Sequence, residues 1–467
     1  MKTVSTLVSA AVLSLMINPL FSQSLDGGWR HALFICADST VMSVGGNDYG
    51  QLGNGTTAPS EQHPAQIPGL TGITDVSAAE RHSLFLKGDG TVWACGYNLF
   101  GSLGDGTITQ RTSPVQVLGL TNIIAISAGG RHSLFLKRDG TVGACGGNYY
   151  GQLGDGTTNE SYTAFQIPSI SGIIAIQAGL SHSVFLKNDS TVWTCGTNFY
   201  GELGLGTSTG TGIPTPTMIP SFTGIKAISA GYDHSLALKG NGTVWAWGNN
   251  IAALGDGTTM FKLSPVQTDN VTNIIAIAAG ANHSSFLKND GTVWACGFNG
   301  AGEVGDGTTV SRNSPVAVGS LTGVAEIAAA DVVSFFKKTN GTTWACGAGG
   351  YSQLGDGGFT SYSTPILSDE VCGFNAGFEN EVLINVSIYP NPNNGVLNLN
   401  IGLQSNIKLQ IGIYNLTGQL VKSITSTEFN EGINVKNVDA SELSNGTYFV
   451  KFYNEDVNKT LKFIINK

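Results

Sequence analysis

The sequence predicts an all-β protein, a seven-bladed β-propeller followed by a small β-sandwich domain. A unit of about fifty residues recurs seven times, each copy carries hairpin turns between short apolar runs, and a different β pattern begins at residue 382. The predicted organisation is a signal peptide over residues 1–23, the propeller over 24–372, a linker over 373–381 and the C-terminal domain over 382–467.

The repeat is most visible in six of the seven histidines, which are separated by 51, 50, 50, 52 and 49 residues. They are His31, His82, His132, His182, His234 and His283. In the seventh copy Val333 stands fifty residues after the last histidine. Such a constant interval indicates one supersecondary unit copied along the chain, so a feature found in every copy is expected to build the unit.

Each copy has a β pattern. Runs such as HSLFLK and TVWACG are joined by Asp-Gly or Asn-Gly pairs, which supply the positive φ angles of tight hairpins. With the later LGDGT turn and the NIIAISAG segment, each copy holds about four strands. Their apolar residues fall on both faces, which suits sheets stacked around an axis. A linear solenoid is the alternative architecture.

The two ends of the repeat array differ from its middle. Copy one lacks the apolar strand that precedes the histidine in other copies, and copy seven stops at Ser368 without beginning an eighth. We therefore expect one blade to be completed jointly by both ends of the array. Such closure removes open edge strands.

The termini indicate export. Met1-Lys2-Thr3 is followed by a mostly apolar stretch to Leu20 and by small residues up to Ser24. This pattern is typical of a secretory signal peptide, and a membrane anchor is the alternative. The mature chain is expected to have no transmembrane segment. From residue 382 alternating strands separated by turns predict a small sandwich.

Charge argues against one class of partner. Between Ser24 and Asn375 the chain has 15 Lys and Arg against 24 Asp and Glu, without basic runs. An acidic propeller is a poor ligand for phosphate backbones, so we expect no nucleic-acid binding.

The repeat pattern GxxHSxxLKxDGTVWxxGxNxxGQLGDGT resembles that of the regulator of chromosome condensation family over residues 24–372. The resemblance implies the propeller fold. It implies no single activity, because the family includes exchange factors, ligase and light-receptor domains and a secreted enzyme inhibitor. One departure is that cysteine replaces a tryptophan-like position in five copies, at Cys95, Cys145, Cys195, Cys296 and Cys346.

The C-terminal segment resembles the type A sorting domain of the type IX secretion system. The residues that match include Tyr389, Pro390, Asn391, Pro392, Gly395, Gly418, Gly446 and Tyr448. The resemblance implies recognition by the type IX secretion machinery and passage across the outer membrane of a Bacteroidetes-type bacterium. The protein would then be released or attached to the cell surface.

The repeated polar residues could suggest chemistry, but a structural role explains them better. One histidine per blade places the imidazoles around a circle, so we expect them to bond backbone groups of the blade turns. The repeated cysteines are expected to be buried small hydrophobes, and the LGDGT aspartates to shape turns. The sequence predicts no enzyme, cofactor or metal site.

Differences between copies point to binding instead. The loops after LGDGT differ in every copy. In addition, the residue directly before the Gly-Gln-Leu-Gly-type turn is aromatic in five copies, which are consecutive blades if the ring is closed. These residues are Tyr49, Phe100, Tyr150, Tyr200 and Tyr351. They predict a face that binds an extracellular protein. A carbohydrate-binding module and a secreted enzyme inhibitor are alternative functions, and packing within the propeller is the alternative role of these residues.

Two cysteines lie outside the repeated position. Cys36 is in the first copy and Cys372 follows the last copy. If the ends meet, these thiols could form a disulfide that locks the ring, and two separate free thiols are the alternative.

Overall fold

The chain divides into two compact units, residues 1–374 and 375–467. The computed structural model describes residues 24–368, 371, 383–389, 395–403, 406–415, 419–430, 432–453 and 458–467. The predicted signal peptide and linker lie outside these residues, so their boundaries stay predictions. Among the described residues no helix is long and apolar enough to cross a membrane.

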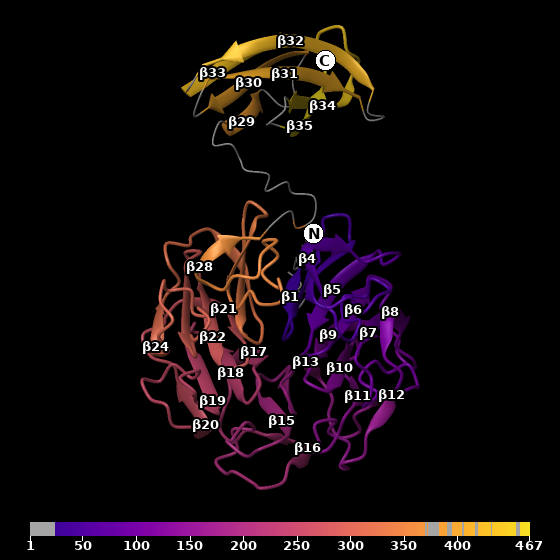
Figure 1. Ribbon diagram of the computed structural model, residues 1–467, viewed down its shortest axis with the longest axis vertical. Coiled ribbons are helices and arrows are strands. Elements are labelled where there is room, and N and C mark those ends of the chain that lie inside the picture. The colour runs from indigo at the N-terminus through magenta and orange to yellow at the C-terminus, as the bar shows by residue number, and fades with distance from the viewer. Residues whose placement is uncertain are drawn as a thin grey trace, which may run out of the picture. The chain divides into compact units, whose positions relative to one another are not determined.

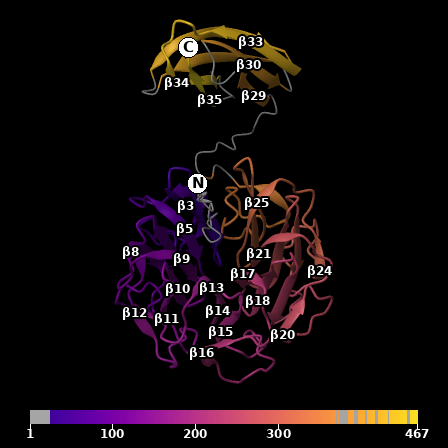
Figure 2. The same cartoon turned by 180° about the vertical axis from the view of Figure 1, so that it is seen from behind.

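The first unit is a ring of seven four-stranded antiparallel sheets (Figures 1 and 2). Each sheet is built from four consecutive strands. The first strand of every sheet lines a central cavity of about 630 Å³, which identifies it as the inner strand of a blade. The predicted seven-bladed propeller is thus confirmed.

The blades follow one another in chain order. Blade 1 contains β1 (Leu25–Gly27), β2 (His31–Ile35), β3 (Val41–Gly46) and β4 (Ser60–Gln66). Blade 2 contains β5 (Ile73–Ala78), β6 (His82–Lys87), β7 (Val92–Gly96) and β8 (Arg111–Gln116). Blade 3 contains β9 (Ile123–Ala128), β10 (His132–Lys137), β11 (Val142–Gly146) and β12 (Ser161–Gln166). Blade 4 contains β13 (Ile173–Ala178), β14 (His182–Lys187), β15 (Val192–Gly196) and β16 (Ile213–Met218).

The remaining blades repeat this pattern. Blade 5 contains β17 (Ile225–Ala230), β18 (His234–Lys239), β19 (Val244–Gly248) and β20 (Lys262–Gln267). Blade 6 contains β21 (Ile274–Ala279), β22 (His283–Lys288), β23 (Val293–Gly297) and β24 (Arg312–Ala317). Blade 7 contains β25 (Val324–Ala329), β26 (Val333–Lys338), β27 (Thr343–Gly347) and β28 (Tyr362–Leu367).

The expectation of a blade shared between the two ends is wrong. Blade 1 has its own inner strand, β1, which pairs Leu25 with Phe34 and Gly27 with Ala32. With three residues, β1 is too short to show an apolar periodicity, which explains why the sequence pattern missed it. The ring therefore closes by packing complete blades 7 and 1 against each other.

Hairpin chemistry sets the turns between the second and third strands. In blade 2 Gly90 has φ +80°, its N–H donates to the Lys87 carbonyl at 2.9 Å, and Asp89 Oδ1 accepts from the Thr91 N–H at 2.9 Å. In blade 4 Ser190 takes the place of glycine and still adopts φ 64°. The Thr191 N–H still donates to Asp189 Oδ1 in this turn, so the contact between carboxylate and threonine is kept although the glycine is absent.

The core consists of apolar layers between neighbouring blades. Between blades 2 and 3, Leu84 and Val92 pack with Phe135 and Cys145 of the next blade, all with 3% exposure or less. The five repeated cysteines are free and buried, as predicted. Because burial favours the neutral thiol, it raises the pKa of each of them.

Six of the seven blade interfaces also contain a buried His–Ser pair. In each, the imidazole Nε2 of one blade lies 2.8–3.0 Å from the serine Oγ of the next blade. The pairs are His31–Ser83, His82–Ser133, His132–Ser183, His182–Ser235, His234–Ser284 and His283–Ser334. The imidazoles were expected to bond backbone groups of the blade turns, whereas the Nε2 atom of each of the six bonds a serine hydroxyl of the next blade. The imidazoles join neighbouring blades. The pattern within one copy of the repeat cannot show such a contact, because its two partners belong to different copies.

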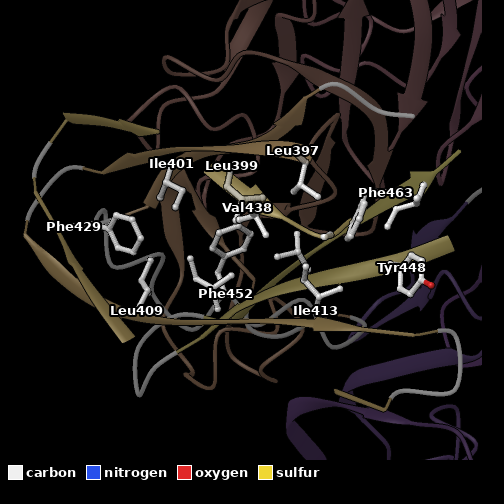
Figure 3. Packing of buried hydrophobic residues seen from close by; sticks show 14 of the residues in the cluster. Leu397, Leu399, Ile401, Leu409, Ile413, Phe429, Val438, Tyr448, Phe452 and Phe463 are labelled. Carbon is white, nitrogen blue, oxygen red and sulfur yellow. The ribbon is translucent and has the colours of Figure 1, made fainter. Parts of the chain in front are cut away.

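The second unit is the predicted β-sandwich. One sheet has the order β29–β30–β33 and the other β32–β31–β34–β35. The strands are β29 (Leu383–Tyr389), β30 (Val396–Leu403), β31 (Ile407–Tyr414), β32 (Leu420–Phe429), β33 (Gly432–Asp439), β34 (Gly446–Tyr453) and β35 (Asn458–Ile465). Figure 3 shows the side chains of both sheets meeting in one core, in which Leu399 faces Phe452 and Ile401 lies near Phe429.

Candidate functional site on the loop face of the propeller

The variable loops share one face with the turns that precede the histidines. In each blade the turn between the first and second strands and the long loop between the third and fourth strands leave the sheet at the same end. In blade 2 the Tyr97 N–H donates to the Arg81 carbonyl at 2.9 Å, which fixes the loop against the turn. We call this side of the propeller the loop face.

The five predicted aromatic residues all start long loops of this face, but they differ in exposure. Tyr49, Phe100 and Tyr150 are half-buried, whereas Tyr200 and Tyr351 are 44% and 36% exposed. None of the five is in the fully buried core. Their side chains are therefore at least partly accessible, as contact with a ligand requires. Their binding to a partner stays a prediction.

An arginine stacks between aromatic rings where blades 7 and 1 meet. The Arg30 guanidinium lies 3.8 Å from the ring centroid of Trp29 and 4.1 Å from that of Tyr351. It also forms a 3.3 Å ion pair with Asp48. Tyr351 of the predicted set is therefore part of an arginine–aromatic contact.

The same arrangement continues in blade 2. The Arg81 guanidinium lies 5.2 Å from Trp29, 5.0 Å from Tyr49 and 5.8 Å from Tyr97, measured to the ring centroids. Its Nη1 donates to the Tyr49 hydroxyl at 3.2 Å. The rings of Tyr49 and Tyr97 meet edge to face at 5.2 Å. Trp29 is thus shared by Arg30 and Arg81.

Blade 3 completes the series. The Arg131 guanidinium lies 4.7 Å from the Phe100 ring, and the Arg131 residue is exposed. Phe100 in turn contacts Tyr97 at 6.2 Å between centroids. We call this set the arginine sector. It consists of Trp29, Arg30, Tyr49, Arg81, Tyr97, Phe100, Arg131 and Tyr351.

Further along the ring the loop face is apolar rather than cationic. Tyr149 is 78% exposed and packs edge to face on Tyr150, which contacts Phe199. Tyr200 contacts Phe261 of blade 5 at 6.2 Å between centroids. We call these five residues the apolar sector. Ring-to-ring contacts hold it in place while leaving large faces in contact with water.

Sequence reasoning found the aromatic arc but missed the arginines. They occupy the position directly before the histidine in blades 1, 2 and 3. The other blades have Ser181, Asp233, Asn282 and Val332 there. A comparison of copies at this position would have found the sector, because three consecutive blades share one charged residue that the others lack.

Acidic groups gather at the mouth of the central cavity on the same face. Asp331 and Glu80 line the cavity together with Tyr232. Burial raises the pKa of the Asp331 carboxyl to about 7, and it also raises the pKa of Tyr232, which is near Asp331. Glu80 is held by Arg81, whose Nε lies 3.0 Å from Oε1.

The residues that could suggest a metal or a reaction have structural contacts instead. Asp105 accepts from the Thr107 N–H at 3.0 Å and from Arg111 Nε at 2.7 Å, so it shapes its LGDGT turn. Among the described residues no three His, Cys, Asp or Glu side chains are grouped as a metal site requires.

The sorting-domain residues that the structure describes lie in strands or directly beside them. Tyr448 is buried in β34, its hydroxyl donates to the Ser444 carbonyl at 3.0 Å, and its ring stacks on Phe463. Gly395 has φ +100°, and a Cβ there would lie 2.8 Å from the Ser441 Cα, so only glycine fits. Gly446 begins β34, and Tyr389 ends β29. Pro390, Asn391, Pro392 and Gly418 lie outside the described residues.

The predicted ring-closing disulfide is described at one end only. Cys36 is buried and disulfide-bonded. Its predicted partner, Cys372, lies outside the described residues, so the pairing itself stays a prediction.

Comparison with known families agrees with this architecture. The RCC1-like domain matches residues 115–389, and the regulator of chromosome condensation (RCC1) repeat matches 38–86 and 89–136. The secretion system C-terminal sorting domain matches residues 387–466. The protein is therefore an exported β-propeller with a sorting domain. The chain belongs to the RCC1-like domain family.

The curated relatives match over short segments. The chain is 32% identical to the ultraviolet-B receptor UVR8 of Arabidopsis thaliana over 90 residues, which are 18% of this chain and 20% of that protein. It is 39% identical to the probable E3 ubiquitin-protein ligase HERC3 of Homo sapiens over 80 residues, 17% of this chain and 8% of that protein. The matches thus span about a fifth or less of these relatives.

Solved structures confirm the fold alone. Yeast RCC1 (Prp20), in a structure with Kap60, has a TM-score of 0.66 at 19% identity, covering 82% of this chain and 94% of that one. Human WBSCR16 has a TM-score of 0.60 at 23% identity, covering 66% and 85%. The sorting domain indicates export by type IX secretion in Bacteroidetes, to the cell surface or the extracellular space.

Proposed function

We propose that the protein is a non-catalytic binding protein that presents the loop face of its propeller to an extracellular protein. The type IX machinery delivers it, and the sorting domain serves as the export address. The observation that carries the proposal is the arginine sector, in which three arginines of successive blades are each stacked on aromatic rings.

Stacking gives these arginines the properties of interface residues. Aromatic contacts restrict the guanidinium groups of Arg30, Arg81 and Arg131 before a partner arrives, so less side-chain entropy is lost on binding. Arginine, tyrosine and tryptophan are also the residue types that contribute most to protein interfaces. Arg131 is exposed and has no ion pair within the described part of the chain, so its charge is available to a partner.

The expected partner presents carboxylates toward blades 1–3 and apolar groups toward blades 3–5. The carboxylates of the partner would pair with the arginine sector, and its apolar groups would cover the rings of Tyr149, Phe199 and Tyr200. Arg30 and Arg81 have ion pairs with Asp48 and Glu80, so Arg131 carries the uncompensated charge of the sector. Since the propeller as a whole is acidic, this local cation also sets the orientation in which an acidic surface can dock.

The test is a binding measurement with the full-length mature protein. A partner captured from culture supernatant is purified, and its Kd is measured for the wild type and for the triple variant R30A/R81A/R131A. We expect at least about a tenfold loss of affinity. The matched control is R138A, because Arg138 is exposed on a hairpin turn of the opposite face. Equal affinity of the triple variant and the wild type would reject the arginine sector as the binding site.

A second variant tests the predicted aromatic residues. Replacing Tyr49, Phe100, Tyr150 and Tyr200 with alanine should remove binding while the melting temperature changes little, because none of them is in the fully buried core. A collapse of the fold would instead assign them to packing, where each such truncation costs about 3–5 kcal/mol.

A glycan is the second candidate ligand, and the apolar sector favours it. Tyr149 is 78% exposed and packs against Tyr150, as an aromatic platform for a sugar does. Glycan-array binding that is lost in Tyr149→Ala but kept in R30A/R81A/R131A would support a glycan over a protein ligand.

A further inference from the structure

Ser24 is the first described residue, and it sits at the interface between blades 1 and 7. Its backbone N–H donates to Glu326 Oε1 at 2.7 Å, and its hydroxyl donates to the other carboxylate oxygen of Glu326. Lys337 Nζ donates to the Ser24 hydroxyl at 2.7 Å. The Ser24 carbonyl accepts from the Ile35 N–H at 2.7 Å. Every polar group of Ser24 is thus engaged, and two of its partners belong to the last blade.

This interface is the one that the linear chain must close. Glu326 and Lys337 are opposite each other on β25 and β26, and Ser24 directly precedes β1. The His–Ser pair of the other interfaces is replaced here by Val333 and Ala32, which lie in one apolar cluster. The contacts of Ser24 are therefore the polar link that takes the place of the missing pair.

The charges around Ser24 are not balanced by side chains alone. Asp26 and Glu326 bring two carboxylates to the interface, and Lys337 supplies one cation. Asp26 is buried and accepts from the Ala78 N–H at 2.9 Å. Burial, with Glu326 adding repulsion, raises the pKa of Asp26 to about 7. A second cation at this place would favour the charged form of both carboxyl groups.

We propose that proteolytic processing at the Gln23–Ser24 bond gives Ser24 a free α-ammonium, and that its ion pair with Glu326 closes the propeller ring. The step is a hydrolysis carried out by a signal peptidase. One water is consumed, the C–N bond breaks, Gln23 keeps the carboxylate, and Ser24 receives the amine, which is protonated at neutral pH. The atom that now donates to Glu326 becomes the charged nitrogen, in the same position.

Processing and closure are thereby linked. An uncleaved chain offers one neutral N–H to Glu326, whereas the processed chain offers a charged group with three donors. The bond of the uncleaved chain is charge-assisted by the carboxylate alone. In the processed chain both partners are ionised, so the attraction between opposite charges is added to the hydrogen bond. The propeller is consequently most stable after the segment that precedes Ser24 has been removed.

The test compares two forms of the chain from Ser24 to Lys467. One is released from a fusion so that Ser24 is the first residue, and the other keeps Gly-Ser-Gly before it. We expect the first form to melt about 2–4 °C higher. The same two forms of Glu326→Gln should melt at equal temperatures. Equal melting of the wild-type forms, or a difference that persists in Glu326→Gln, would overturn the proposal.

Two measurements avoid any variant, in case Glu326→Gln fails to fold. The pKa of the Ser24 amine, followed by pH-dependent labelling of the folded protein, should be above the ordinary range of about 7.7–8.0. A value within or below that range would overturn the ion pair. Mass analysis of the exported protein should give an N-terminal peptide that starts at Ser24, and any other start would overturn the processing site.

Discussion

Val333 in blade 7 and Ala32 in blade 1 occupy the positions at which all six other blade interfaces have a histidine and a serine. Both are buried in one apolar cluster with Phe34 and Phe335, whose rings meet edge to face at 5.9 Å. Replacing both partners avoids a buried polar group without a partner, which would cost more than the hydrogen bond contributes. At this interface the two end copies have thus changed together, since blade 7 lacks the histidine and blade 1 lacks the serine that would pair with it.

The His–Ser pairs should accept the same double replacement elsewhere. His132→Val alone removes the Nε2 contact to Ser183 and is expected to cost about 1–3 kcal/mol in the free energy of unfolding. Ser183→Ala also removes the hydroxyl that donates to the Gln152 carbonyl at 2.7 Å and leaves that carbonyl only the weak Cys195 thiol donor at 3.6 Å. The double variant should cost about 1 kcal/mol less than the sum of the single variants. Denaturant unfolding of the mature protein measures this cycle, and additive single effects would contradict the coupling.

Acid should weaken the propeller through its histidines. Burial lowers the pKa of all six, to about 3 for His132 and about 4 for His82. In the unfolded chain their pKa is about 6.5, so the unfolded state takes up protons that the folded state refuses. The stabilisation of the folded protein that comes from keeping these histidines neutral is therefore present in full above pH 6.5. It is lost as the pH falls toward 4.

Five carboxyl groups act in the opposite direction. Burial raises the pKa of Asp26, Glu202 and Asp331 to about 7, and it also raises the pKa of Asp233 and Glu303. The folded state therefore takes up protons on these groups as the pH falls from 7. Since six histidines outnumber them, we expect the denaturant midpoint to fall between pH 6.5 and 4.5. In the variant H132V/S183A one histidine no longer titrates. The free energy of unfolding should therefore change less steeply with pH, by about 1.4 kcal/mol per pH unit. An unchanged slope would mean that His132 is not neutral and buried in the folded state.

The repeat made most of the fold predictable. The fifty-residue interval and the hairpin pairs identify seven blades, since identical copies must form identical units. β1 was missed because three residues carry no periodicity. The His–Ser pairs were missed because each joins two copies, and a pattern read within one copy says nothing about contacts between copies.

The site was less predictable than the fold. Aromatic residues at the start of the loops were correctly placed on one face, yet Tyr149, the more exposed neighbour of Tyr150, was overlooked. The arginines were overlooked because arginine is usually a solvated surface residue. Only the distances from Arg30 to Trp29 and Tyr351 show that these charges belong to the aromatic set.

Export should depend on a separable domain. The sandwich has a core of its own, formed by residues such as Leu399, Phe452 and Phe463, and the blade cores contain none of them. Deleting residues 382–467 should leave the propeller folded but held in the periplasm. Immunoblots of periplasm and medium measure the distribution, with R138A, at an exposed residue of the propeller, as the control that keeps the sorting domain intact. Wild-type amounts of the deleted form in the medium would refute the address function.

The last prediction concerns the disulfide of Cys36. Cys36 follows β2 directly, in the blade that must be joined to the last one, and the five other cysteines within the described residues are free. We predict that its partner is Cys372, which follows the last blade in the sequence. A bond between them would close a loop of more than three hundred residues, for which chain entropy predicts about 5 kcal/mol of stabilisation. The variant C36S should therefore lower the free energy of unfolding by an amount of this order, whereas C95S, at a free thiol, should lose only a packing contribution. A non-reduced digest gives the direct answer, because a peptide that links Cys36 to Cys372 confirms the lock, and free thiols at both positions exclude it.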